Sequence, residues 1–315
     1  MKSKSDGVLR VVSVSGGKDS TALYIWAIRR FGRDGFRAVF ADTGNEHPVT
    51  LNYVRNLPAM AGGPSVQWVK ADFELRLDHK GIEPTDSVFL DLCLIKGRVP
   101  SSKAQFCTEN LKMAPIRDWL LTEAKGRKVI SFTGIRAGES KRRSRCAAAE
   151  FLPYYPCWTV RPLLRWTEEQ VFAYLDAAGV PPNPLYEAGF SRVGCFPCIH
   201  SRKSELVRMN DDAWAKIARW EERIGRSWFS AGTIPPSAKQ KSALDTIQRD
   251  NPAPEGADDD WRSEAEQTWI NENMVPTVAE VRDWCRTTRG GNQYDLLVPE
   301  PADVRRCMSA WNVCE

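Results

Sequence analysis

Near its start the chain passes from an apolar run into a glycine-rich loop and then into a helical pattern. Residues 8–14 have the composition of a buried strand, residues 15–20 read Ser-Gly-Gly-Lys-Asp-Ser, and residues 21–31 have helical periodicity. A buried strand joined to a helix by such a short loop is typical of a β-α-β unit. This segment predicts a parallel sheet with crossover helices.

The same alternation continues through the first two thirds of the chain. Further strands are predicted over 37–41, 66–70 and 128–133, and a helix is predicted from near Pro48. A later helix starts after Thr167, because Thr167 and Gln170 have the spacing of a capping box, and it ends before Gly179. We therefore expect an α/β fold: an open, mostly parallel sheet with helices on both faces.

The character of the sequence changes after Cys198, which predicts a second, smaller helical region. We place a nucleotide-binding domain with its cysteines at residues 1–203 and a helical C-terminal region at residues 204–315. Within the latter, 204–226 is predicted to be one charged amphipathic helix whose tryptophans pack in a small core. An exposed loop is expected over 231–260, and two helices follow over the ranges 260–273 and 277–287.

The composition of the chain limits the cellular compartment and the kinds of ligand that we expect. The 315 residues contain no apolar run of membrane-spanning length, and the N-terminus lacks the apolar segment of a secretory signal. We therefore expect a cytoplasmic protein with no membrane partner. Close pairs among its nine cysteines are expected to serve metal or thiol chemistry rather than disulfides, and isolated ones to be small core or surface residues. The net charge of +4 is compatible with an anionic ligand or a nucleic acid and establishes neither.

The loop at residues 15–20 has the chemistry of a phosphate site. Its glycines, Gly16 and Gly17, let the backbone approach an anion, and the amides at the start of the helix point at it. The hydroxyl groups of Ser15 and Ser20 and the ammonium of Lys18 add donors. Asp19 would repel phosphate alone, so we expect Asp19 to hold Mg²⁺. The spacing matches neither a Walker A loop nor a dinucleotide fingerprint.

These residues resemble a known family. Ser-Gly-Gly-Lys-Asp-Ser after an N-terminal strand looks like the pyrophosphate loop of the PP-loop adenine-nucleotide α-hydrolase superfamily, which implies ATP as the ligand. Residues 40–48 resemble a segment of the phosphoadenosine-phosphosulfate (PAPS) reductases, and Asp42, at the carboxyl end of the strand, is expected to contact the nucleotide or its metal. Residues 133–140 resemble their G-x-R-x-x-E-S segment, so Gly134 and Arg136 are expected at the nucleotide, with Arg136 as an anion ligand. The basic residues 141–143 fit a solvated loop equally well. The resemblance covers residues 8–205.

The cysteines are the second strong signal. Cys195 and Cys198 form a C-x-x-C pair that suits a metal, a cluster or a redox disulfide. Together with Cys107, Lys112 and Pro115 they resemble the layout that holds a [4Fe–4S] cluster in adenylylsulfate reductases. One of the family's tandem cysteines is replaced by Phe106 here, so three ligands are placed and the fourth is unknown. Candidates for the fourth ligand are Cys157, Cys285, Cys307 and Cys314.

Two other readings of the missing ligand stay open. An iron with an open position would suit binding of a sulfide for transfer, as in cluster-dependent sulfurtransferases of this superfamily. A zinc site or an unligated C-x-x-C pair is the simpler alternative.

The intact loop and the missing nucleophile motif favour one function. No Glu-Cys-Gly-Ile/Leu-His motif of the cluster-free reductases is present, whereas a complete loop suits cleavage of ATP to AMP and pyrophosphate. We expect Lys18, Asp19, Lys112 and Arg136 to be the catalytic residues of an enzyme that adenylates an acceptor and then transfers sulfur to it. The chain is similar to DNA-phosphorothioation sulfurtransferases, which implies a nucleic-acid acceptor, a sulfur donor such as a cysteine desulfurase, and a dimer or larger complex.

Two alternatives come from other classes of protein. The first is a phosphoadenylylsulfate or adenylylsulfate reductase that forms sulfite. The second is a non-enzymatic module that binds a nucleotide.

Overall fold

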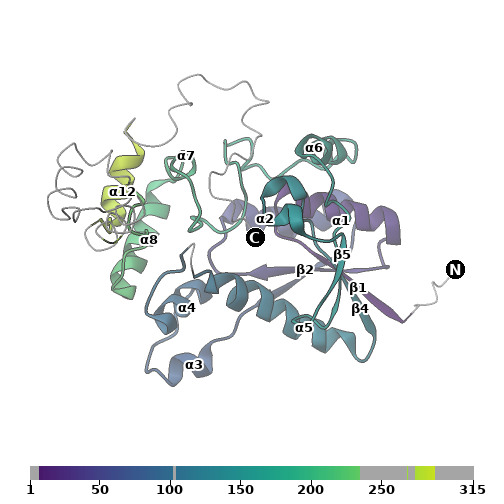
Figure 1. Ribbon diagram of the computed structural model, residues 1–315, viewed down its shortest axis with the longest axis horizontal. Coiled ribbons are helices and arrows are strands. Elements are labelled where there is room, and N and C mark those ends of the chain that lie inside the picture. The colour runs from purple at the N-terminus through teal and green to yellow at the C-terminus, as the bar shows by residue number, and fades with distance from the viewer. Residues whose placement is uncertain (1–6, 102–103, 235–267, 269–273, 288–315) are drawn as a thin grey trace, which may run out of the picture. The chain divides into compact units, whose positions relative to one another are not determined.

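A computed structural model describes residues 7–101, 104–234, 268 and 274–287 of the chain (Figure 1). The predicted fold class is confirmed, because the sheet has six strands in the order β3-β2-β1-β4-β6-β5 and is parallel except for its last pair. The strands are β1 (Val8–Ser13), β2 (Arg37–Asp42), β3 (Val66–Lys70), β4 (Lys128–Phe132), β5 (Ala149–Leu152) and β6 (Cys157–Val160).

The order in which strands are added to the sheet reverses at β1. After β1 the chain adds β2 and then β3 on one side, and it later places β4 and β6 on the other. Val12 of β1 faces Ala38 of β2 and Phe132 of β4. Ligands of open α/β sheets bind outside the carboxyl ends of the strands at such a switch point. The loops after β1 and β4 are therefore the place to look for a nucleotide.

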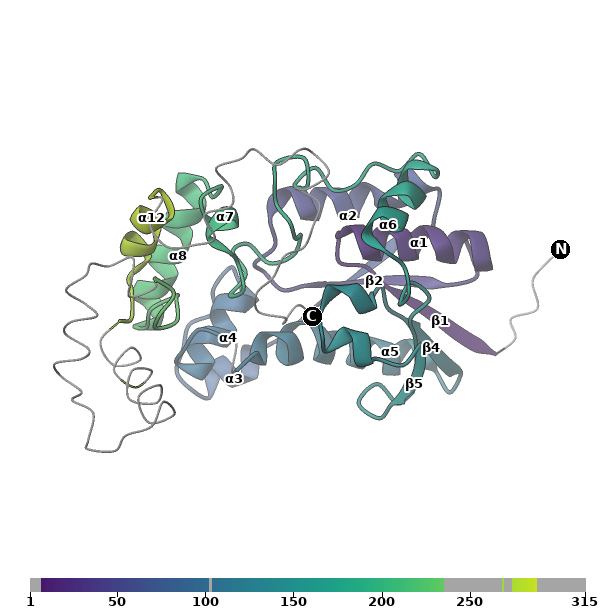
Figure 2. The ribbon, with the colours of Figure 1, turned by 45° about the horizontal axis from the view of Figure 1, so that its top comes forward.

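Helices cover both faces of this sheet (Figure 2). One face packs Val12, Phe40 and Phe132 against the apolar sides of α1, α2 and α6. The opposite face packs Leu9 and Val11 against Leu120 of α5. These layers fix β1 and its following loop from both sides. The helices of this part are α1 (Lys18–Phe31), α2 (Pro48–Ala61), α3 (Glu74–Asp78), α4 (Val88–Lys96), α5 (Ala114–Ala124) and α6 (Glu168–Asp176), with a π-helical turn over Thr108–Met113 and 3₁₀ turns over Ala137–Glu139 and Arg143–Arg145.

The expected elements are present, and others were missed. Strand β3 has the predicted bounds, and Thr167 and Gln170 form the predicted capping box. Helix α1 begins at Lys18 rather than at residue 21, so the end of the phosphate loop is already helical. Helix α4 was missed because its residues are apolar almost without interruption and show no period. Strands β5 and β6 were missed because each has only four residues.

The described residues fall into two compact units. The first contains 7–92 and 104–200, with the whole sheet; the second contains 93–101, 201–234 and 274–287. The division predicted at residue 203 stays a prediction. Among the helices described, none has the length and apolar character needed to cross a bilayer.

The second unit holds α7 (Lys203–Leu206), α8 (Asp211–Ile224) and α12 (Val278–Cys285). The single helix predicted over 204–226 is wrong: the chain breaks after α7, and Asn210 caps a new helix by accepting a hydrogen bond from the Ala213 amide.

The small aromatic core predicted here is confirmed for the described tryptophans of α8. Trp214 packs against Phe229, and Trp220 packs against Trp228. Most of the loop predicted over 231–260 and of the helix over 260–273, together with Cys307 and Cys314, lies outside the described residues.

Candidate active site

The phosphate loop connects β1 to α1 at the carboxyl edge of the sheet and is held by its own hydrogen bonds. The Ser20 hydroxyl oxygen accepts from the Ser15 amide at 3.1 Å, and the hydroxyl donates to the Gly17 carbonyl at 3.0 Å. Gly16 has φ +78°, and a Cβ there would lie 2.8 Å from a methyl carbon of Thr50. Both the backbone conformation and the lack of space therefore require glycine at position 16.

Two cations and two carboxylates meet at the start of α1. Lys18 Nζ lies 3.8 Å from Asp19 and 3.4 Å from Glu168, and all three side chains are largely buried. Arg136 Nε donates to the Asp19 carboxylate. Burial alone lowers the pKa of Lys18, but the neighbouring Tyr186, Asp19 and Glu168 outweigh that effect and hold the pKa above its ordinary value. Lys18 is therefore a permanent cation beside the loop.

These contacts bear on the expected roles of Asp19 and Arg136. The Asp19 carboxylate contacts Lys18 and Arg136, so a magnesium ion there would have to displace or share these partners. Arg136, which follows β4, is brought to the phosphate loop as expected, and its anionic partner in this structure is Asp19. The roles of both residues stay predictions.

Gly134 lets the loop after β4 pack closely against the start of α1. A Cβ at Gly134 would lie 2.9 Å from the backbone oxygen of Asp19, so a larger residue would push the loop after β4 away from α1. This contact places Gly134 against the nucleotide loop, where the sequence put it. It also keeps Arg136 within reach of Asp19.

Three residues at this site were missed in the sequence. The Tyr186 hydroxyl accepts a hydrogen bond from the Lys18 amide at 3.0 Å, and Asn183 Nδ2 donates to the Gly16 carbonyl at 3.1 Å. Glu168 was interpreted only as part of the first turn of α6. No motif marks these positions, and Asn183 and Tyr186 lie in the proline-rich segment that follows the end of α6. The one available signal was the single Asn among the prolines and apolar residues of this segment.

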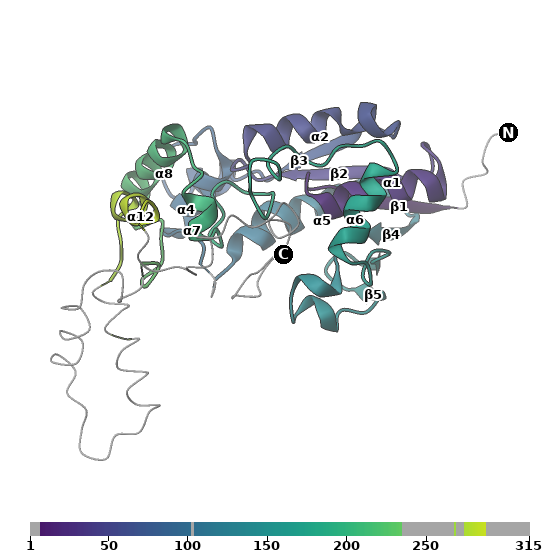
Figure 3. The ribbon, with the colours of Figure 1, turned by 90° about the horizontal axis from the view of Figure 1, so that it is seen from above.

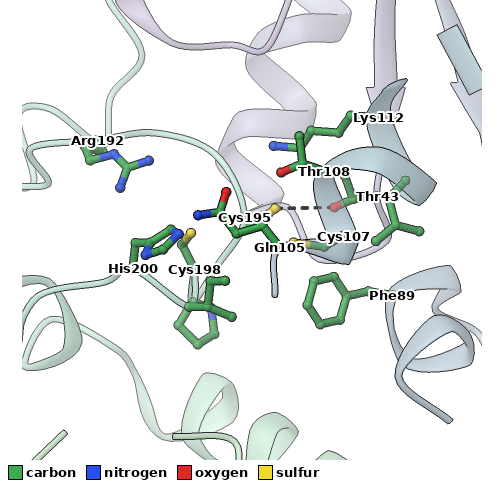
Figure 4. A pocket seen from close by; sticks show the side chains of 13 residues that line it. Thr43, Phe89, Gln105, Cys107, Thr108, Lys112, Arg192, Cys195, Cys198 and His200 are labelled. Atoms are coloured by element: carbon green, nitrogen blue, oxygen red, sulfur yellow. Dashed lines mark hydrogen bonds between the residues drawn. The ribbon is translucent and has the colours of Figure 1, made fainter. Parts of the chain in front are cut away.

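The three expected cysteines line one cavity of about 30 Å³. Cys107 comes from the segment before the π-helical turn, and Cys195 and Cys198 come from the C-x-x-C loop. Figure 4 shows these side chains around the cavity, with Lys112 and Thr43 near Cys195. The remaining lining residues are Phe89, Gln105, Thr108, Leu111, Arg192, Pro197, Ile199 and His200.

The loop after β2 holds the C-x-x-C segment in place. The Phe196 amide donates to the Asn45 carbonyl at 2.6 Å, and the buried Asn45 side chain donates to the Pro197 carbonyl at 3.2 Å. Glu46 and Cys195 also form an isolated antiparallel bridge. Asp42, the expected nucleotide ligand, accepts from the Gly44 amide at 2.9 Å and so shapes this loop. The strand edge therefore determines where the thiols lie.

Thr43 and Glu46 form the polar wall beside Cys195. Thr43 donates from its amide and its hydroxyl to the two carboxylate oxygens of Glu46, at 3.1 and 2.6 Å. The Thr43 hydroxyl lies 3.6 Å from the Cys195 sulfur. Burial raises the pKa of Glu46 above its ordinary value, although the Thr43 hydrogen bond and the charge of Lys112 oppose the shift.

Burial is also the largest influence on the pKa values of Cys107 and Cys195. Desolvation raises the pKa of Cys195 to about 12, and it raises the pKa of Cys107, while the charge of Lys112 opposes both shifts. The thiols of Cys107 and Cys195 are thus protonated near neutral pH in this arrangement, with Lys112 as the nearby cation that favours their thiolates.

The cavity was tested as a site for the expected cluster. Its donors have the right chemistry, but within the described ranges no three His, Cys, Asp or Glu residues are arranged so that they could hold a metal ion. Cys157 lies in β6 and does not line the cavity, and Cys285 lies in α12 of the second unit. The described residues therefore do not form a cluster site in this conformation.

The cysteine segment passes beside the phosphate loop. A Cβ at Gly17 would lie 3.4 Å from the Tyr186 hydroxyl and 3.8 Å from the carbonyl oxygen of Val193, two residues before Cys195. The phosphate loop and the segment that carries two thiols therefore share one edge of the sheet.

Known proteins were compared with the chain. Over 99% of its length it is 36% identical to a 37.8 kDa protein in the gpa 5′ region of Escherichia phage 186, and the match covers 98% of that relative. An adenosine 5′-phosphosulfate reductase of Rhizobium tropici is 36% identical over 83 residues, which are 26% of this chain and 46% of the reductase. The chain thus spans less than half of that enzyme.

A solved PAPS reductase from Candida auris aligns with 61% of this chain and 82% of its own, at 19% identity and a TM-score of 0.43. Residues 10–201 match the family described as the phosphoadenosine phosphosulfate reductase domain. That match takes in the phosphate loop, the loop after β2, the loop after β4 and the three cysteines. The chain belongs to the phosphoadenosine phosphosulfate reductase domain family.

Proposed function

We propose that this protein binds MgATP at residues 15–20, cleaves it to AMP and pyrophosphate, and uses the adenylated acceptor for sulfur transfer at Cys107, Cys195 and Cys198. The observation that carries the proposal is the position of the Val193 carbonyl oxygen, 3.8 Å from where a Cβ on Gly17 would lie, so that the phosphate loop lies beside the C-x-x-C segment. A family member that only bound a nucleotide would have no need of three thiols at this edge.

In the first step an acceptor oxygen attacks the α-phosphorus of MgATP. The bond from the α-phosphorus to the bridging oxygen breaks, and pyrophosphate leaves with that electron pair. Lys18, the loop amides and the positive end of α1 stabilise the charge that develops on the leaving group. In this proposal the nucleotide releases Arg136 from Asp19, and Arg136 then contacts the α-phosphate.

In the second step a sulfur nucleophile at the level of hydrosulfide replaces AMP on the acceptor. The new bond joins sulfur to the acceptor, the bond to AMP breaks, and AMP leaves with the electron pair. A cysteine desulfurase partner, whose persulfide a thiol reduces, would supply hydrosulfide. The acceptor that we propose is a DNA phosphate, and Lys112 is the cation that favours ionised sulfur beside Cys107 and Cys195.

We keep an iron–sulfur cluster on these three cysteines as a proposal that requires a change of shape. Cys107 and the C-x-x-C loop come from separate segments, so a small shift of either loop would enlarge the cavity between them. Iron and acid-labile sulfide in protein purified without oxygen would support it. No step above depends on the cluster.

A reductase is the second candidate, favoured by the Rhizobium tropici relative. In that case the loop would bind a sulfonucleotide, and thiol electrons would release sulfite. The same cavity would then supply reducing thiols and no acceptor would be needed.

The test is a product assay on anaerobically purified protein. Incubation with MgATP, with and without DNA, is expected to release pyrophosphate and AMP, and DNA is expected to stimulate the release. Sulfite from PAPS or adenylylsulfate with a thiol reductant, without pyrophosphate from MgATP, would make the protein a reductase. Cys195→Ser is the matched variant: it should retain nucleotide binding and lose sulfur transfer, and unchanged transfer would reject the cysteine assignment.

A further inference from the structure

The hairpin of β5 and β6 carries two large aromatic side chains on the outer edge of the sheet. Phe151 and Trp158 are cross-strand partners, are 50% and 51% exposed, and their rings meet edge to face with centroids 6.2 Å apart. Cys157 and Thr159 point to the opposite face and are buried. Figure 3 shows this hairpin at the end of the sheet beyond β4. A hydrophobic edge of this kind is a liability unless it binds something.

The positive charge of the chain is concentrated around this hairpin. Residues 125–165 contain ten Lys and Arg against two Asp and Glu, a net charge of +8, although the whole chain has 44 against 40 and a net charge of +4. The remaining residues therefore carry a net charge of −4. Both acids of the stretch are already paired: Glu139 with Arg143 and Glu150 with Arg161. An anionic partner would meet little opposing charge here.

The basic loop before β5 joins the hairpin to the nucleotide site. It begins at Arg136, and it is fixed in its middle by the buried Arg143, which bonds to Glu139 at 2.6 Å and whose amide donates to Ser140 at 3.1 Å. With Arg143 turned inward, Lys141, Arg142 and Arg145 are exposed. This loop is therefore not uniformly solvated, and in the sequence its exposed cations lie between Arg136, at the phosphate loop, and the start of β5.

Positive charge is also present on β4, the strand that pairs with β6. Trp158 lies opposite Ile130 of β4, and Lys128, two residues earlier on β4, is on the same face of the sheet and exposed. The aromatic pair thus has an exposed cation on the neighbouring strand β4, and three more in the loop that leads into β5. Alternating rings and cations form the usual surface for a single nucleic-acid strand, whose unstacked bases lie on the rings while the phosphates contact Lys and Arg.

We propose that the β5–β6 hairpin and the loop over residues 141–145 bind single-stranded DNA and lead it to the nucleotide site. The proposal rests on the DNA acceptor of the proposed function and adds the surface that would hold it. A strand rather than a duplex is favoured because an edge-to-face pair needs an unstacked base to cover it. Self-association through this hairpin would bring two strongly positive surfaces together, which disfavours a second copy of the chain as the occupant.

The test measures binding of a fluorescein-labelled single-stranded oligodeoxynucleotide of about 20 nucleotides, longer than the usual site sizes, by fluorescence anisotropy. F151A/W158A is expected to weaken binding about ten-fold. R142E/R145E is expected to weaken it more and to reduce the dependence on salt. The controls are Leu75→Ala, an exposed apolar residue on α3, and R30E/R33E, which makes the same charge change at the end of α1.

The outcomes separate this proposal from the proposed function. Binding that is unchanged in both hairpin and loop variants, or weakened equally by the R30E/R33E control, would overturn the surface. So would light scattering that shows a dimer dissociated by F151A/W158A with DNA binding intact. If no variant releases pyrophosphate, wild type included, yet binding still depends on Trp158, the surface stands and the proposed reaction fails. Loss of DNA stimulation with basal pyrophosphate release intact would support both.

Discussion

The phosphate loop and the cysteine cavity lie at the same edge of one sheet, but they are built in opposite ways. The loop is six consecutive residues whose internal hydrogen bonds, such as Ser15 to Ser20, close it locally. The cavity is assembled from four separate segments of the sequence, and the side chain of Asn45 ties two of them together. Local chemistry defines the first region, and tertiary contacts define the second.

This difference predicts how each region responds to substitution. A change in the loop should affect nucleotide binding directly, because its donors are the binding groups. A change in the cavity should leave nucleotide binding intact and act on sulfur chemistry, unless it loosens the loop after β2. Substitutions in each region can show whether nucleotide binding and sulfur chemistry depend on separate residues.

The largest effect is expected for Lys18→Ala. Loss of its buried ammonium removes a cation placed to stabilise the leaving pyrophosphate, and we expect pyrophosphate release to fall by about 10²- to 10³-fold. Lys112→Ala is the matched change in the cavity, where pyrophosphate release should stay within about two-fold of wild type while sulfur transfer is lost. Equal losses of pyrophosphate release in the two variants would show that the regions act as one unit.

The next effect concerns the backbone of the loop. Gly16→Ala places a Cβ 2.8 Å from Thr50 at a φ of +78°, so we expect the free energy of unfolding to fall by about 2–3 kcal/mol and MgATP binding to be lost. Urea unfolding and calorimetric titration measure both.

Gly17→Ala is the control for this change. Its Cβ would meet only ordinary contacts, 3.4 Å from Tyr186 at the nearest. If this variant is destabilised as much as Gly16→Ala, the steric argument fails.

The contrast between local and tertiary contacts also explains which features could be predicted from the sequence. The phosphate loop, the neighbouring strand and the capping box of Thr167 could be predicted because each is encoded within a few adjacent residues. The shared cavity of Cys107 and Cys195 could be expected only through the family resemblance, since spacing does not reveal which loops meet. The roles of Glu168 and Tyr186 could not be predicted, because each reaches Lys18 from a distant segment that carries no motif.

Helix α4 and the β5–β6 hairpin show why elements were missed. The apolar sequence of α4 has no helical period, and its form is set by burial from all sides. The two strands of the hairpin are separated by Pro153 and Pro156, which dominate the local pattern. Pairing of β6 with β4 is what makes the segment a strand.

Asn45→Ala should give the third-largest effect of these substitutions. It removes the buried hydrogen bond to the Pro197 carbonyl, and we expect a loss of about 1–2 kcal/mol in the free energy of unfolding. Sulfur transfer should fall because the C-x-x-C segment is less well fixed, whereas the dissociation constant of MgATP should not change. A weaker nucleotide affinity in this variant would show that the loop after β2 also supports the phosphate loop, and the comparison would need revision.

The smallest effect is expected for Glu168→Gln. Its carboxylate lies 3.4 Å from the Lys18 ammonium and so competes with phosphate for that cation. Removing the negative charge should tighten pyrophosphate and MgATP binding by a few-fold, which corresponds to less than about 1.4 kcal/mol. Glu169→Gln is the control, because it removes the same charge from the same helical turn at an exposed position. Weaker binding in Glu168→Gln alone would mean that Glu168 acts together with the nucleotide, for example through its magnesium ion, and that the phosphate loop too depends on a distant segment.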